Sequence, residues 1–141
     1  MKNFILPFLF VAFAASAQDT PKMAVERFFA AFHAKDTAAL RQVMHKTATM
    51  HSVSERRDAA RLSAESIGQL LKSIAAIPPD MKFEEKLLSI NEQVDGSMAH
   101  VWTPYEFYVN GTKSHGGVNS FHLFNDAGQW KILHIADTRR K

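Results

Sequence analysis

The sequence of 141 residues contains no cysteine. This absence excludes disulfide bonds, zinc sites with thiolate ligands and a membrane anchor attached to a lipidated cysteine. Long apolar runs are also missing, because no stretch beyond the N-terminal segment is long and apolar enough to span a bilayer. We therefore expect a chain that is stabilised by the packing of its hydrophobic core.

A large excess of charge of one sign is absent as well, since the formal net charge is only +3. The basic residues are spread along the chain, and their one small cluster is Arg139-Arg140-Lys141 at the C-terminal end. Proteins that bind nucleic acids gather Lys and Arg on one surface. We therefore expect no nucleic-acid partner, and we interpret the C-terminal cluster as solvated.

The histidines do not form a recognisable metal-binding pattern. His45 and His51 stand apart from other donors, and the three later ones, His100, His122 and His134, are spread over alternate positions of expected strands. A metal centre in a protein needs a third ligand at a recognisable spacing. We therefore expect neither a metal ion nor another cofactor.

The N-terminus has the features of a secretory signal peptide. Lys2 precedes an apolar run over residues 4–15, and an Ala-Ser-Ala pattern precedes Gln18. The alternative is an anchoring helix, but the run is shorter than the roughly 20 residues of a membrane span and contains a proline. We predict a signal peptide over residues 1–17 and one domain over residues 18–141. The protein would then be exported, periplasmic or secreted, with no membrane attachment after cleavage.

Hydrophobic spacing predicts three helices. Thr20 and Pro21 are the expected N-cap and first-turn proline of the first helix, which carries an aromatic face. Asp36 caps a shorter second helix over residues 37–44. After a short strand over residues 48–54, Ser63 is expected to cap a third helix that ends before Pro78.

Residues from Lys82 onward have the alternation and turn signals of an antiparallel meander. Two-residue hairpin turns are expected at Asp95-Gly96 and Asn110-Gly111, and a longer turn is expected around Gly128. The predicted strands lie over residues 82–94, 97–109, 112–124 and 129–138. Helices followed by such a sheet indicate the α+β class.

The turn at residues 110–111 sets the expected register of the two strands beside it. Counting back from this turn places Glu106 opposite His115 and Trp102 opposite Asn119. These four side chains would share one face of the sheet. A β-bulge at the following Gly-Gly pair is the alternative, and it would move His115 to the opposite face relative to Asn119.

The second face of the predicted sheet is apolar as well. It carries Tyr105 with Val101, Thr103 and Phe107, and the Asp95-Gly96 turn would place Ile90 opposite Val101. Because one face must meet the helices, we expect the other to meet a second copy in a homodimer. A monomer with scattered surface aromatics is the alternative.

The order of elements and three segments resemble the nuclear transport factor 2-like superfamily, which includes SnoaL-like cyclases, ketosteroid isomerase and scytalone dehydratase. The segments are AVERFFAAFHAKDTAAL over residues 24–40, TMHSV over residues 49–53, and VWTPYEFYVNGTKSHGGVNSFHLFNDAGQWKILHIADTRR over residues 101–140. The resemblance implies an α+β cone, with three N-terminal helices packed on a curved, mainly antiparallel sheet of four to six strands. It also implies a pocket at the wide end and dimers formed through the sheet.

Two groups of candidate site residues follow. His115 oriented by Glu106, or else Asp137, would act as a general base. The expected pocket residues are His51, Trp102, Tyr105, His115 and Asn119. For the His115–Glu106 pair, an ordinary cross-strand contact is an equally good interpretation, and aromatic residues in sheets more often serve packing than ligand binding.

Three functions remain open, because this fold carries many unrelated activities. The first is binding of a small apolar or aromatic ligand, which the aromatic pocket favours. The second is a cofactor-free proton-transfer enzyme, such as an isomerase, a dehydratase or a cyclase. The third is a protein association module.

Overall fold

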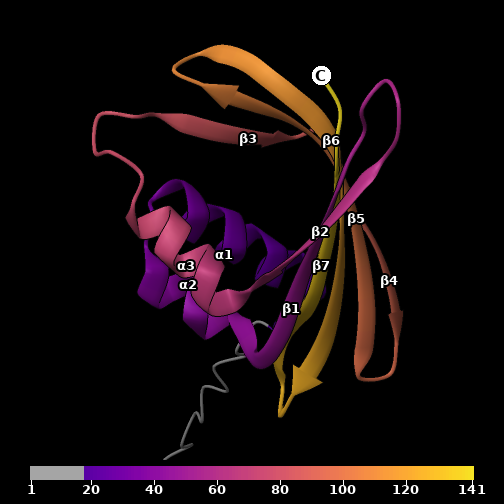
Figure 1. The fold of residues 1–141 in the computed structure, drawn as a ribbon. Helices are drawn as coiled ribbons and strands as arrows, with labels where there is room; N and C mark the ends of the chain where they lie inside the picture. The colour runs from indigo at the N-terminus through magenta and orange to yellow at the C-terminus, as the bar shows by residue number, and fades with distance from the viewer. Residues whose placement is uncertain (1–17) are drawn as a thin grey trace, which may run out of the picture.

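The structure, a computed structural model, describes residues 18–141, which form three helices and a seven-stranded sheet (Figure 1). The elements are α1 (Pro21–His33), α2 (Thr37–Val43), β1 (Met44–Ser54), β2 (Arg61–Ser66), α3 (Ile67–Ala75), β3 (Phe83–Leu87), β4 (Asn91–Asp95), β5 (Met98–Val109), β6 (Thr112–Asp126) and β7 (Gln129–Arg139). The predicted α+β class is confirmed, with more strands than expected. The signal peptide predicted over residues 1–17 lies outside the described residues.

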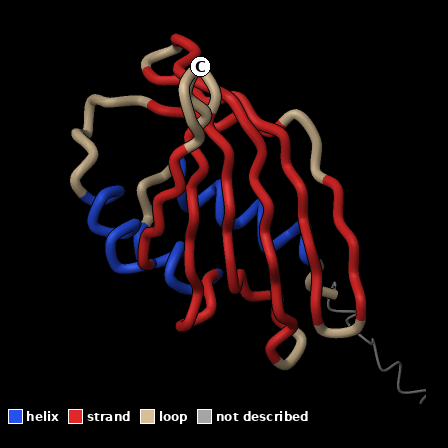
Figure 2. Tube along the Cα trace, turned by 45° about the vertical axis from the view of Figure 1, so that its right-hand side comes forward, coloured by secondary structure: helices blue, strands red, loops and turns tan. Residues whose placement is uncertain are grey.

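The sheet is curved, and the helices lie on its concave face (Figures 1 and 2). Its strand order is β2-β1-β7-β6-β5-β3, and β4 also pairs with β5. β1 and β7 run parallel, whereas the other neighbouring pairs are antiparallel. The β5–β6 hairpin and β3 arch over α1 and α3, so the sheet forms both a wall and a roof (Figure 1).

Side-chain caps begin the helices. Thr20 Oγ1 accepts a hydrogen bond from the Met23 N–H at 3.2 Å, and Asp36 Oδ1 accepts one from Ala39 at 2.9 Å, so both predicted caps are confirmed. The third cap was predicted wrongly, because Ser63 lies in β2 opposite Ser52. α3 begins instead after Ser66, where Ser66 and Gln69 form a reciprocal capping box.

The predicted strand over residues 82–94 is divided into β3 and β4. Both pair with β5, on either side of Pro104. The Leu88 N–H donates to the Pro104 carbonyl at 2.8 Å, so Pro104 faces this edge with its carbonyl and has no N–H to offer it. The β4–β5 turn is also displaced from Asp95-Gly96, because Asp95 pairs with Met98 and Glu92, not Ile90, lies opposite Val101.

The β5–β6 turn is confirmed at Asn110 and Gly111, whose φ angles are 49° and 80°. The register beyond it was predicted wrongly. It shifts after the Tyr108–Lys113 pair, where Ser114 is the extra residue of a β-bulge.

The bulge at Ser114 changes which side chains share a face. His115 consequently pairs with Phe107, and Asn119 pairs with Thr103. His115 and Asn119 therefore lie on the concave face with Tyr105, while Glu106 and Trp102 lie on the convex face.

The core lies between α1, α2, α3 and the concave face. Phe28 and Phe29 of α1 both make edge contacts with Phe121 of β6, with ring centroids 5.7 and 5.8 Å apart. Phe121 is fully buried, as are Leu123 on the same strand and Ile132 on the neighbouring strand β7. Within residues 18–141, no helix has the length and hydropathy of a membrane span.

Candidate functional site

A cavity of about 420 Å³ lies between the helices and the concave face. Its apolar wall consists of Phe28, Phe29, Phe32, Leu70, Ile74 and Ile77 from the helical layer and Met50, Phe107, Phe121 and Ile135 from the sheet. The polar residues that line it are Glu65, Ser73, Glu85, Tyr105, His115, Asn119, Asp137 and Arg139. A cavity of this size, whose lining combines an apolar wall with convergent polar groups, has the features of a small-molecule site.

Glu85 and Asn119 form a polar contact in the lining of this cavity. Asn119 is only 6% exposed, and its Nδ2 donates to Glu85 Oε1 at 2.6 Å and to Thr103 Oγ1 at 3.3 Å. Burial raises the pKa of Glu85 to about 7, although the hydrogen bond from Asn119 opposes this effect. Near neutral pH the Glu85 carboxyl is therefore divided between a form that donates a hydrogen bond and a form that only accepts.

Asp137 and Arg139 form an ion pair beside this carboxyl. Arg139 Nε lies 2.9 Å from Asp137 Oδ2, and the Asp137 side chain is only 10% exposed. Both side chains come from β7, two residues apart, so they lie on the same face of the strand. The negative charge of Asp137 also contributes to the raised pKa of Glu85.

His115 and Tyr105 complete the polar part of the lining. Burial, and to a smaller extent the positive charge of Arg139, lower the pKa of His115, so its imidazole is neutral at neutral pH. Its ring stacks on Phe107 with centroids 4.8 Å apart. The Tyr105 hydroxyl donates to the Thr138 carbonyl at 2.9 Å, and burial raises the pKa of this phenol. Tyr105 therefore contributes its ring to the cavity, while its hydroxyl is bonded to the backbone.

Glu106 does not face His115. It lies on the convex face, where its carboxylate accepts hydrogen bonds from Lys113 Nζ at 2.6 Å and from the Tyr108 hydroxyl at 2.7 Å. These bonds, that of Lys113 above all, lower the pKa of Glu106. The predicted His115–Glu106 pair was wrong, because the extra residue at Ser114 separates the two side chains onto opposite faces.

The predicted pocket residues divide between the two faces. Tyr105, His115 and Asn119 line the cavity. Trp102 is 45% exposed on the convex face, and His51 lies on that face too, with its Nδ1 3.0 Å from His134 Nε2. Neither Trp102 nor His51 lines the cavity, while the catalytic candidate Asp137 does.

Glu85 is the residue that reasoning from the sequence missed. The signal was present, because Phe83, Glu85 and Leu87 alternate along β3 with the exposed residues Glu84 and Lys86. A glutamate at an apolar position of an alternating strand indicates a carboxyl turned towards the core. Within residues 18–141, no group of three or more His, Asp or Glu side chains is arranged to hold a metal ion.

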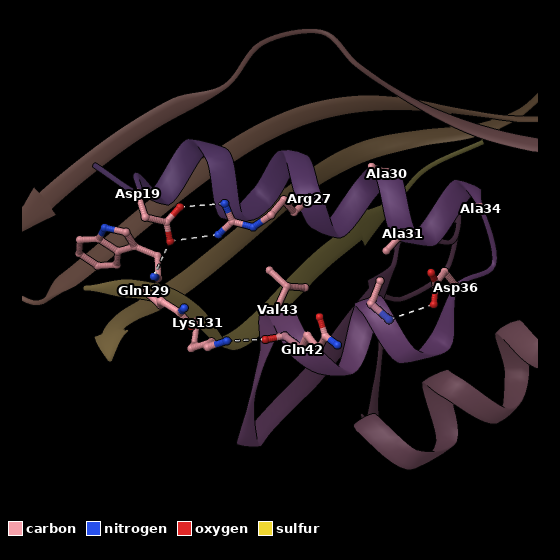
Figure 3. Close-up of a pocket in the computed structure, with 12 residues that line it drawn as sticks. Asp19, Arg27, Ala30, Ala31, Ala34, Asp36, Gln42, Val43, Gln129 and Lys131 are labelled. Atoms are coloured by element: carbon pink, nitrogen blue, oxygen red, sulfur yellow. Dashed lines mark hydrogen bonds and ion pairs between the residues drawn. The ribbon is translucent and has the colours of Figure 1, made fainter. Parts of the chain in front are cut away.

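A second hollow, of about 600 Å³, lies outside the cavity, between α1, α2 and the start of β7 (Figure 3). Asp19 binds both terminal nitrogens of Arg27 at 2.8 and 3.0 Å and accepts the Trp130 N–H at 2.9 Å. Lys131 Nζ donates to the Gln42 carbonyl at 2.6 Å. These charged groups form hydrogen bonds within the protein and connect α1, α2 and β7. We therefore regard the interior cavity, and not this second hollow, as the candidate site.

The chain matches no protein-family model and none of the curated proteins. Solved structures do match it. A nuclear transport factor 2-like protein of unknown function from Shewanella baltica is 15% identical, with 85% of this chain and 90% of that chain covered and a TM-score of 0.60. A proposed dehydratase of the same family from Streptomyces avermitilis is 15% identical, with coverage of 85% and 93% and a TM-score of 0.62.

A proposed ketosteroid isomerase from Shewanella frigidimarina is 17% identical, with coverage of 82% and 91% and a TM-score of 0.59. The chain has the nuclear transport factor 2-like fold. The resemblance seen in the sequence is confirmed at this level, and the cavity lies under the roof of the cone that this fold forms. Identities this low establish the fold and no activity, because one scaffold carries many functions.

Proposed function

We propose that the protein binds a small, mostly apolar molecule in the interior cavity. The observation that carries this proposal is the composition of the cavity lining, which combines aromatic and aliphatic side chains with a smaller set of polar ones. Burying apolar surface contributes about 25 cal/mol per Å², which provides the affinity. The polar groups provide the orientation.

Glu85 and Asn119 are suited to recognise a carbonyl or a hydroxyl group of the ligand. With a pKa of about 7, the neutral Glu85 carboxyl donates to a carbonyl oxygen, and the ionised carboxylate accepts from a hydroxyl. The partly desolvated setting strengthens such a hydrogen bond.

Binding of the uncharged fluorescent probe N-phenyl-1-naphthylamine to residues 18–141 tests this proposal. Ile77 lines the cavity just after α3, so Ile77→Trp should fill the space and abolish saturable binding. Met23→Trp is the matched control, since Met23 is exposed on α1 and does not line the cavity. Circular dichroism would establish that both variants fold. Probe binding that is absent in the wild type, or unchanged in Ile77→Trp, would contradict the proposal.

Native mass spectrometry of residues 18–141 from an exporting host would identify the natural ligand class through a discrete retained mass. The same spectrum counts the subunits.

We also propose that the protein is exported to the periplasm or beyond and forms a homodimer through the convex face. Support for the dimer comes from the large apolar side chains exposed there: Met98, Trp102 and Phe124.

A proton-transfer enzyme is the second candidate, and the titratable groups of the cavity favour it. Glu85, Asp137 and His115 line the same space, and a carboxyl with a pKa of about 7 is matched to proton abstraction next to a carbonyl. Hydrogen–deuterium exchange of α-protons in a panel of cyclic ketones, followed by NMR, should then be faster with wild type than with Glu85→Gln. Equal rates for the two proteins would exclude this role of Glu85. An association module remains the third candidate, and a monomer with no partner would count against it.

A further inference from the structure

A basic hollow adjoins the interior cavity. It encloses about 910 Å³ and is lined by Ser54, Glu55, Arg56, Arg57, His115, Arg139, Arg140 and Lys141. His115 and Arg139 also line the interior cavity, so the two spaces meet at these residues. A ligand that extends past His115 and Arg139 would therefore occupy both spaces.

The fold concentrates charge that the sequence keeps apart. Arg56 and Arg57 follow β1, whereas Arg139, Arg140 and Lys141 end the chain. The parallel pairing of β1 with β7 brings the two groups together, because Ser54 lies opposite Arg139 and the Glu55 N–H donates to the Arg139 carbonyl at 2.9 Å. The residues of the C-terminal cluster are exposed, in keeping with the solvated cluster expected from the sequence, and they line a hollow together with two further arginines.

The arginine at the junction is oriented by its ion pair. Arg139 binds Asp137 through Nε, and within residues 18–141 no hydrogen bond is recorded from its two terminal nitrogens. A guanidinium held along one edge presents its other N–H groups in a fixed fork, which matches the oxygens of a carboxylate, sulfonate or phosphate. His115, neutral at neutral pH, adds a neighbouring hydrogen-bonding ring without adding charge.

The charges around the hollow are unequal. Five cationic side chains line it, against the carboxylate of Glu55 and the adjacent carboxylate of Asp137. A concave surface with charge of one sign attracts ligands of the opposite sign. Because the hollow adjoins the cavity, such a ligand would place its anionic group in the hollow and its apolar part in the cavity.

We propose that the ligand is a small amphipathic anion, whose apolar body fills the cavity and whose anionic group lies in the basic hollow between Arg139 and Arg56-Arg57. This assignment rests on the proposed binding function, since it requires the cavity to hold the apolar body. It names the ligand class: an organic carboxylate, sulfonate or phosphate with one compact apolar part.

Two probes that differ by one anionic group test the assignment. N-phenyl-1-naphthylamine is uncharged, and 8-anilino-1-naphthalenesulfonate has the same ring skeleton with a sulfonate. Wild-type residues 18–141 should bind the sulfonate more tightly, by about five- to tenfold, which corresponds to a few exposed ion pairs. Because these pairs are accessible to solvent, the advantage should shrink as the salt concentration rises.

The double variant Arg56→Gln/Arg57→Gln should lose most of this advantage and keep its affinity for the uncharged probe. The matched control is Arg41→Gln/Lys46→Gln, which removes the same charge from exposed positions that line neither space and should preserve the preference. Ile77→Trp should weaken both probes. This would show that they occupy the cavity.

The possible outcomes separate the two proposals. If both probes bind equally, or if both double variants weaken the sulfonate to the same extent, the anionic assignment is overturned and the binding function stands. If neither probe binds in the cavity, the binding function itself fails and the assignment fails with it. A sulfonate preference that only Arg56→Gln/Arg57→Gln removes supports both.

Discussion

The two faces of the sheet carry different titratable side chains, a buried carboxyl on the concave face and a group of histidines on the convex face. The concave face carries a carboxyl with a raised pKa, Glu85, which lines the interior cavity. The convex face carries four histidines on adjacent strands, His51, His134, His122 and His100, with successive ring centroids 5.2, 5.8 and 5.1 Å apart. Neighbours in the sequence such as Tyr105 and Glu106 are thus assigned to different environments by strand alternation alone.

This comparison teaches that the two faces should respond differently to substitution and to pH. On the concave face, burial favours the proton-bound carboxyl of Glu85. On the convex face, burial and neighbouring rings lower the pKa values of His100 and His134, which favours the proton-free imidazoles. Acidification should therefore stabilise the first face relative to neutral pH and destabilise the second.

The largest effect on stability is expected at Gly117, where the backbone of β7 approaches β6 too closely for a side chain. A Cβ at Gly117 would collide with the backbone carbonyl of Thr138, so Gly117→Ala should lower the free energy of unfolding by about 3 kcal/mol. Urea denaturation measures this change. Gly68→Ala is the control, because its Cβ has room in α3 and should leave stability equal or higher. Equal effects of the two substitutions would show that the strands can separate without cost.

The next effect is the pH dependence that Glu85 contributes. Its pKa rises from 4.5 to about 7 on folding, so the folded state holds more protons than the unfolded state between these values. The free energy of unfolding should therefore fall as the pH rises through this window, by about 2–3 kcal/mol, and should level off above it. Glu85→Gln should remove this slope, as urea denaturation from pH 4.5 to 8 would measure. Glu84→Gln, at an exposed position beside it, should retain the slope.

On the convex face, Trp102 should matter for assembly and little for folding. Trp102→Lys places a charge in the proposed dimer interface and should raise the dimer Kd by at least about tenfold. Light scattering during size-exclusion chromatography measures the subunit number. Met23→Lys, an equally simple change at an exposed apolar residue on α1, should leave the dimer intact. A wild-type monomer, or a Trp102→Lys dimer of unchanged Kd, would remove the convex face as the interface.

The four histidines of the convex face, His51, His134, His122 and His100, should make this proposed dimer sensitive to acid. Burial in the fold lowers the pKa values of His100 and His134 below their ordinary 6.5, so protonation opposes folding as the pH falls. Burial of the same face in the proposed dimer would add to this effect. Like charge on the facing rings of His122 and His51 also contributes to the lowered pKa values of His100 and His134. The dimer Kd should therefore rise about three- to tenfold from pH 7.5 to 5.5. His100→Gln/His134→Gln should flatten this dependence, and a Kd independent of pH in the wild type would contradict it.

Much of the fold could be predicted from local signals. The caps at Thr20 and Asp36 and the turn at Asn110-Gly111 act over a few residues, and the sequence displays them directly. β2 was missed because its short segment has no alternation of its own and gains strand structure by pairing with β1. Pairing of this kind is a tertiary effect that local propensity does not contain.

The candidate site was predicted only in part, for a different physical reason. Asp137, a catalytic candidate, lines the cavity together with the expected pocket residues Tyr105, His115 and Asn119. The choice of His51 and Trp102 failed. For Trp102 the failure arises from one inserted residue, since a shift of one position exchanges the faces of a strand.

Deletion of that inserted residue, Ser114, tests how far the bulge determines the difference between the two faces. Its expected effect on stability is the smallest of these predictions. Tyr108 pairs with Lys113, and Phe107 pairs with His115. Removing Ser114 would make these two pairs consecutive, and their side chains already point to alternate faces. His115 should stay on the concave face, and the free energy of unfolding should fall by less than about 1 kcal/mol. Because Asn119 would still face Glu85, the pH dependence of stability between pH 4.5 and 7 should persist in the deletion variant. Its loss would mean that the bulge itself, through the bend it gives β6, holds the cavity in shape.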